Sequence, residues 1–146
     1  LKKYRRHLLY LKPNVLLVLD DIQTDKHSKL ELRFHPEQKT AVQDGKAFVC
    51  RSEKTALRVE PLTLDGVTAT AEDTDQIDRN NKALPMFTIR LQAAKQAWRN
   101  ATALSWCKAG EDPIKVSLQV DGDRWTFTAG ETTVLFVWDK EAASVE

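Results

Sequence analysis

YRRHLLYLKPNVLLVLDDI, residues 4–22, is the stretch of sequence that decides the fold. Two apolar runs rich in β-forming residues lie on either side of the turn Lys12-Pro13-Asn14. The second run, Val15–Leu19, is apolar at every position, which is typical of a strand that is buried on both faces. We therefore expect a strand pair inside a sandwich, with the second strand ending at Asp20 and Asp21.

The rest of the sequence continues this β pattern. Apolar and polar residues alternate with a period of two in four further runs, and each run predicts a strand with one buried and one solvated face. These runs are Leu30–His35, Phe87–Ala93, Val116–Val120 and Trp125–Thr128, in which Trp125 and Phe127 are expected core residues. The run Thr132–Trp138 is apolar on both faces and predicts a central strand.

Turn signals separate these runs at short, even intervals. Asp-Gly pairs occur at residues 44–45, 65–66 and 121–122, and they supply the positive φ angles that tight turns need. The pattern predicts an all-β fold, an antiparallel β-sandwich of about eleven or twelve short strands.

Three segments depart from the pattern. Residues 91–102 lack a helical period and are expected to form two strand pieces around a bend. Residues 72–84, EDTDQIDRNNKAL, are polar and predict a long mobile surface loop. Residues 1–140 are expected to form one sandwich domain, and residues 141–146 a flexible tail. Because the chain begins at Leu1 rather than Met, we also expect it to be the C-terminal part of a larger protein.

The composition limits the classes of partner. Lys plus Arg number 22 and Asp plus Glu number 21, so no overall field favours nucleic acid or an anionic membrane. No run of 18 apolar residues is present that could span a bilayer. Cys50 and Cys107 can form a bridge in an oxidising compartment, but free cysteines pack as small apolar residues, and two buried thiols are expected.

Metal and acid–base sites are not predicted by the sequence. The histidines, His7, His27 and His35, lack metal-ligand spacing and make a zinc site only if the fold gathers them. The acidic run that starts at Asp73 lacks the third ligand, the Gly and the final Glu of a calcium loop. Asp20 and Asp21 point to opposite faces of a strand and cannot share a substrate. We therefore predict no catalytic residue, no metal and no cofactor.

The best binding candidates are outward-facing cations and one tryptophan. Arg5 and Arg6 lie in a basic cluster near the N-terminus, and Arg33 and His35 lie on another solvated face. Guanidinium groups bind carboxylates and sulfates in a bidentate way, so these residues suit an acidic polymer. Trp98 lies among polar residues and is the tryptophan expected to be exposed. The alternative interpretation is an ordinary solvated strand surface, or a surface that touches a missing domain.

Four segments together resemble the C-terminal β-sandwich of heparinase II/III-like polysaccharide lyases. They are RRHLLYLKPNVLLVLDDI at residues 5–22, HSKLELRFHP at 27–36, PMFTIRLQAAKQAWRNATALSWCKAG at 85–110 and TTVLFVWD at 132–139. The resemblance implies a larger bacterial enzyme, periplasmic or secreted, in which an N-terminal α/α toroid packs on the sandwich. It implies β-elimination on a uronate-containing polysaccharide.

The family's catalytic Tyr and His residues lie in the toroid and the early sandwich strands. No segment here maps onto them, so the resemblance implies a fragment that is not catalytic by itself. Its partners would be the missing toroid and early sandwich strands and an acidic polysaccharide, with no nucleic acid and no membrane. The alternative is a stand-alone carbohydrate-binding or adhesion module.

Overall fold

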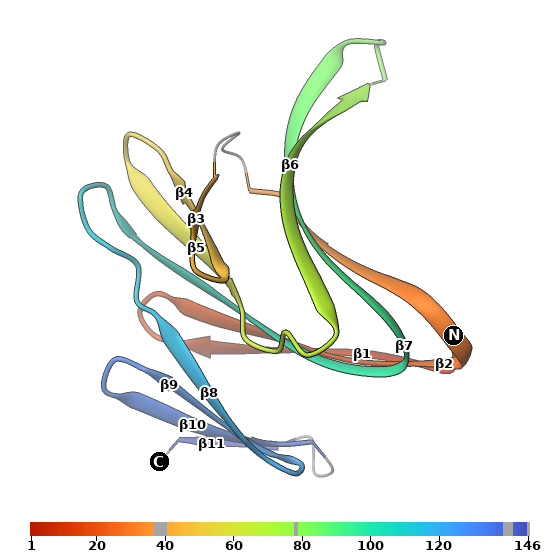
Figure 1. Cartoon of the computed structure of the whole chain (residues 1–146). Coiled ribbons are helices and arrows are strands. Elements are labelled where there is room, and N and C mark those ends of the chain that lie inside the picture. Colours follow the sequence, from red (N-terminus) through yellow and green to blue (C-terminus); the bar gives the residue numbers. More distant parts are fainter. Residues whose placement is uncertain (37–40, 78, 139–141, 146) are drawn as a thin grey trace.

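Two antiparallel sheets make up the chain, which the computed structural model describes over residues 1–36, 41–77, 79–138 and 142–145. The larger sheet has the strand order β1-β2-β7-β5-β4-β3, with β6 also paired to β7, and the smaller has the order β11-β10-β9-β8. Figure 1 shows the smaller sheet facing one side of the larger, which curves strongly. The predicted all-β antiparallel sandwich is confirmed. The strands are β1 (Lys3–Leu11), β2 (Val15–Phe34), β3 (Ala41–Asp44), β4 (Ala47–Arg51), β5 (Thr55–Pro61), β6 (Val67–Ile77), β7 (Ala83–Lys108), β8 (Val116–Asp121), β9 (Arg124–Ala129), β10 (Thr132–Val137) and β11 (Ala142–Val145).

The strand β7 is the common partner of three others. One of its edges pairs with β2 through residues 89–105 of β7. Its other edge is shared by β5, which pairs with residues 102–108, and β6, which pairs with residues 83–93. The segment Leu62–Gly66 connects these two partners and passes beside the uncovered middle of β7, where Leu62 N donates to Ala101 O at 2.9 Å.

The opening stretch forms the hairpin β1–β2, with Leu11 opposite Val15 and Arg6 opposite Asp20. Leu17 and Leu19 are fully buried in the core between the two sheets. Ile22 belongs to a second core on the other side of the larger sheet. The prediction that this strand is buried on both faces is therefore confirmed.

The prediction that this strand ends at Asp20 and Asp21 is wrong, because β2 continues to Phe34. The two acids do point to opposite faces, and each is neutralised by a cation from β1. Arg6 donates to Asp20 through Nε at 2.7 Å and Nη2 at 3.2 Å. Lys3 Nζ lies 2.5 Å from Asp21. Paired in this way, both carboxylates are buried without interrupting the strand.

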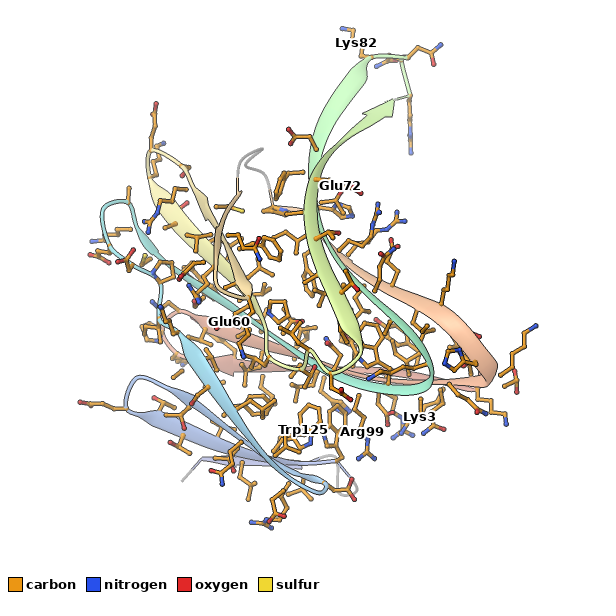
Figure 2. All side chains as sticks on the ribbon, in the orientation of Figure 1. Lys3, Glu60, Glu72, Lys82, Arg99 and Trp125 are labelled. Carbon is orange, nitrogen blue, oxygen red and sulfur yellow. The ribbon has the colours of Figure 1, made fainter. Side chains whose placement is uncertain are left out.

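The core between the sheets is dominated by aromatic rings. Trp125 and Phe127 of β9 are buried, as their alternation with threonines predicts. Trp138 lies edge to face with both Trp125 and Phe136, at centroid distances of 5.1 and 4.9 Å. Figure 2 shows Trp125 between the two sheets. The central strand predicted near the C-terminus is also confirmed, because β10 lies between β9 and β11.

A register shift changes which residues of β7 face inward. The four residues of β2 between Gln23 and Ser28 lie opposite the single residue Gln96 of β7, so β2 bulges there. Before this point Leu91 and Ala93 face the second core, and after it Trp98 joins them there. The prediction that Trp98 is exposed is wrong, because only 2% of its surface is accessible. Residues 91–102 form part of one continuous strand, with the irregularity where the bend was predicted.

Two polar segments that predict a loop and a tail are strands instead. Residues 72–77 belong to β6 and pair with residues 83–88, so the predicted mobile loop is largely a two-stranded hairpin, with residue 78 outside the described residues. Figure 2 places Lys82 at the tip of this projecting hairpin. Residues 142–145 form β11 and pair with β10, where a tail is expected, and residues 141 and 146 lie outside the described residues. Backbone pairing carries these strands, so no apolar alternation marks them.

The two cysteines are unbridged. Cys50 is buried as expected, whereas Cys107 is only partly buried. Cys50 lies in β4 and Cys107 in β7, and β5 runs between these strands. Burial raises the pKa of the Cys50 thiol above its ordinary value, which makes it a packing residue rather than a nucleophile.

We expect Trp125→Ala to lower the free energy of unfolding by about 3–5 kcal/mol, because a large buried ring leaves a cavity that its neighbours fill only in part. Urea unfolding followed by circular dichroism measures this. Thr126→Ala, a change at the next residue on the half-buried side, serves as the control and should cost less than about 1 kcal/mol. An unchanged midpoint for Trp125→Ala would contradict the assigned core.

Candidate functional site

A polar face lies on the outer side of the strands β2, β7 and β6. Paired residues in neighbouring strands point to the same side of a sheet, so cross-strand rows define this face. One row consists of Glu31, Gln92 and Thr68. The next row towards the projecting hairpin consists of Arg33, Arg90 and Thr70. We call these six residues, with Lys29, His35, Thr88 and Glu72, the polar face.

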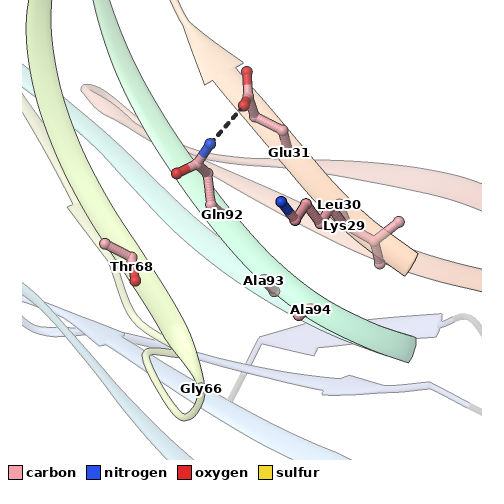
Figure 3. Close-up of a pocket in the computed structure, with 8 residues that line it drawn as sticks. All are labelled: Lys29, Leu30, Glu31, Gly66, Thr68, Gln92, Ala93 and Ala94. Carbon is pink, nitrogen blue, oxygen red and sulfur yellow. Dashed lines mark hydrogen bonds between the residues drawn. The ribbon is translucent and has the colours of Figure 1, made fainter. Parts of the chain in front are cut away.

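A pocket of about 470 Å³ opens on the polar face, as Figure 3 shows. Small residues give it depth, because Gly66, Ala93 and Ala94 carry little or no side chain. Polar groups from three strands surround it, which is the usual make-up of a site for a small polar ligand. Its lining consists of Lys29, Leu30, Glu31, Gly66, Thr68, Gln92, Ala93 and Ala94.

The carboxylate of Glu31 organises this face. Gln92 Nε2 donates to Glu31 Oε2 at 2.8 Å, and Arg33 Nε donates to Glu31 Oε1. Arg90 lies 3.3 Å from the same oxygen and pairs with Glu72 at 2.5 Å. The hydrogen bond from Arg33, followed by the one from Gln92, lowers the pKa of Glu31 below its ordinary value. Glu31 is therefore ionised and well supplied with donors at neutral pH.

The structure separates the predicted binding residues into four places. Arg33 and His35 share the polar face, where the His35 ring nitrogen Nδ1 lies 3.2 Å from Thr88 Oγ1. Arg5 and Arg6 are neighbours in β1 and point to opposite sides of it. Trp98 is buried and cannot contact a polymer. The five residues therefore do not form one site.

The sequence did not predict a second surface, on β1. Tyr4, Leu8 and Tyr10 have 48, 60 and 55% of their surface accessible, although they belong to a run that predicts burial. Alternate positions of a strand share one face, so these side chains line the side of β1 that points away from the smaller sheet. The feature of the sequence that could have indicated this surface is the even spacing of the three residues. It becomes informative only once β1 is known to be an edge strand.

The histidines lie apart from one another. His7 packs against Phe136 with ring centroids 5.1 Å apart, whereas His27 is exposed in the bulge of β2. Among the described residues, no three His, Cys, Asp or Glu side chains come together in a way that could hold a metal ion. In the described part of the chain, no helix has the length and apolarity that a membrane crossing needs.

No family model matches this chain, and no curated protein matches it. Among solved structures, its fold matches a part of a lyase. That enzyme is heparan sulfate lyase HepC from Pedobacter heparinus, and the match has a TM-score of 0.74 at 14% identity over 95% of this chain and 24% of the lyase. A mutant of the same lyase matches with a TM-score of 0.70 at 12% identity, over 98% of this chain and 23% of that one.

At identities this low the likeness establishes the fold. This chain spans about a quarter of the length of the lyase that it matches. The resemblance in the sequence is thus supported at the level of a domain.

We expect Glu31→Gln to destabilise the fold at neutral pH, because it replaces an ionised acceptor of the Arg33 and Gln92 hydrogen bonds. The pKa of Glu31 is lower in the folded chain, so its contribution is present above the unfolded-state value of about 4.3. That contribution is lost as the pH falls through the folded-state value. The difference in unfolding midpoint between wild type and variant should therefore shrink as the pH is lowered from 7 towards 3. Glu131→Gln, in the exposed turn between β9 and β10, is the control. A difference in midpoint between wild type and Glu31→Gln that does not vary with pH would contradict the prediction.

Proposed function

We propose that this chain is the β-sandwich domain of a polysaccharide lyase, and that it supports rather than performs β-elimination on a uronate-containing polysaccharide. The observation that carries the proposal is the backbone match to heparan sulfate lyase HepC, which extends over 95% of this chain but 24% of that enzyme. The remaining three quarters of such an enzyme would supply the partner domain. A lyase of this kind would act in the periplasm or after secretion.

The titratable groups of the two described surfaces favour a supporting role. β-Elimination needs a base whose pKa lies near the working pH, to remove the proton next to the carboxylate. Glu31 has a lowered pKa because Arg33 and Gln92 donate to it, which makes its carboxylate a weak base. Burial, followed by the charge of Asp20, raises the pKa of Tyr4, which keeps this phenol protonated at neutral pH.

An acidic polysaccharide is the proposed ligand of the domain. Arg5, Arg6, Arg33 and His35 remain the candidate contacts, and Trp98 is withdrawn because it is buried. Guanidinium groups match the geometry of carboxylates and sulfates, and contacts of this kind weaken as salt screens them. We expect weak binding to the isolated chain, with a Kd of about 1 mM.

We expect the purified chain to leave heparin, heparan sulfate and alginate uncleaved, because its described surfaces lack a convergent acid–base set. The assay follows the ultraviolet absorbance of the unsaturated uronate that β-elimination creates. The heparan sulfate lyase matched above is the positive control on heparan sulfate. Steady growth of the chromophore, in a preparation free of contaminating lyase, would overturn the supporting role. A stand-alone carbohydrate-binding module would also bind without cleaving. The length of the natural polypeptide separates the two proposals, because a lyase needs a further domain.

A further inference from the structure

A row of exposed side chains follows the outer edge of the larger sheet. Tyr4, Arg6, Leu8 and Tyr10 alternate along β1 and point to the side away from the smaller sheet. Trp106 of β7 continues the row, because its ring is nearly parallel to that of Tyr10, at a centroid distance of 6.0 Å and an angle of 10°. We call these five residues the β1 stripe. A cluster of exposed apolar side chains on a folded domain commonly marks a binding surface.

Hydrogen bonds hold the aromatic end of the β1 stripe in place. The hydroxyl of Tyr10 donates to Pro13 O at 2.5 Å. Asn14 Nδ2 donates to Trp106 O at 2.7 Å, and Trp106 N donates to Asn14 O at 3.1 Å. The turn between β1 and β2 therefore fixes both aromatic residues. A ligand that binds there meets groups that are already ordered, so little conformational entropy is lost on binding.

The cation of the β1 stripe presents its charge outward. Arg6 uses Nε and Nη2 to bind Asp20, and neither bond involves Nη1. The Asp20 side chain is 0% exposed, whereas that of Arg6 is 38% exposed. A ligand approaching the stripe therefore meets the guanidinium rather than the carboxylate.

On the polar face, by contrast, the carboxylates that pair with the arginines are partly exposed. Its arginines Arg33 and Arg90 are paired with Glu31 and Glu72, whose side chains are 26 and 42% exposed. These carboxylates would repel an anionic polymer. Charge complementarity therefore favours the β1 stripe as the place where an acidic ligand binds.

We propose that the β1 stripe is the surface through which this chain holds an acidic polysaccharide. The C–H faces of sugar rings pack on Tyr10, Trp106 and Tyr4, and a carboxylate or sulfate pairs with Nη1 of Arg6. Tyr10 lies six steps along the strand from Tyr4, about 20 Å away, which gives room for several sugar units. This inference rests on the proposed function and names the residues of its ligand site.

The tryptophans provide a direct readout of this contact. Trp98, Trp125 and Trp138 are 2, 6 and 3% exposed, whereas Trp106 is half-buried and lies in the stripe. We expect heparan sulfate at low salt to protect part of the tryptophan fluorescence from acrylamide, a neutral quencher. Trp106→Phe should abolish this protected part.

Substitutions then test the stripe residue by residue in calorimetry against heparan sulfate. We expect Tyr4→Ala and Tyr10→Ala each to weaken binding about tenfold, as truncated aromatic anchors do. Arg6→Lys keeps a positive charge beside Asp20 but loses the planar fork of donors, so it should weaken binding. The matched control is Val120→Ala, at an exposed apolar residue of β8, and it should bind as wild type does.

The outcomes separate this inference from the proposed function. Wild type that binds no acidic polysaccharide at low salt would overturn both. If wild type binds, but Tyr4→Ala and Tyr10→Ala bind equally well and Trp106 is not protected from the quencher, the stripe alone is overturned. In that case, weaker binding by Arg33→Ala would place the contact on the polar face. A wild-type dimer in ultracentrifugation that Leu8→Ala dissociates would make the stripe a protein interface and also overturn the inference.

Discussion

The pairing of β7 with three other strands is the constraint on which the rest of the structure depends. This strand runs from Ala83 to Lys108 and pairs with β2 on one edge and with β5 and β6 on the other. Because β2 bulges between Gln23 and Ser28, the sheet bends at that point and buries apolar residues on both of its faces. The bend also separates the polar face, which lies on the β6 side, from the β1 stripe, which lies on the side of the first hairpin.

Buried charge occurs on two inner strands of this sheet, β2 and β5. Asp20 and Asp21 are buried, and Arg6 and Lys3 of the edge strand neutralise them. A comparable pair joins Arg58 and Glu60 in β5, with Nε to Oε2 at 2.9 Å. Buried ion pairs add little net stability, since desolvation offsets the attraction, but they penalise any strand register that leaves a charge unpaired. In β1 this pairing has a second consequence, because it fixes the guanidinium of Arg6 beside the exposed aromatic side chains.

The two surfaces give the domain different means of contact. On the polar face, cations and carboxylates neutralise one another around Glu31, and a pocket of about 470 Å³ offers hydrogen-bonding groups. On the β1 stripe, ordered aromatic rings lie beside a cation whose counter-charge is buried. For the supporting role proposed above, such ordered contacts matter more than titratable groups near neutral pH.

The sequence by itself determined the fold class and most of the core. Apolar and polar side chains alternate with a period of two in a strand that buries one face. This pattern made the burial of Trp125 and Phe127 predictable, and the unbroken apolar run after Asn14 predicted the strand that is buried on both faces. The sequence also supplied the candidate cations, but it could not say which of them share a surface. Tertiary structure decided that Trp98 is buried, because the alternation of β7 changes phase between Ala93 and Trp98, where its register with β2 shifts. It also decided that the polar segments around Glu72 and Ser144 are strands, because their pairing uses backbone groups that every residue type carries.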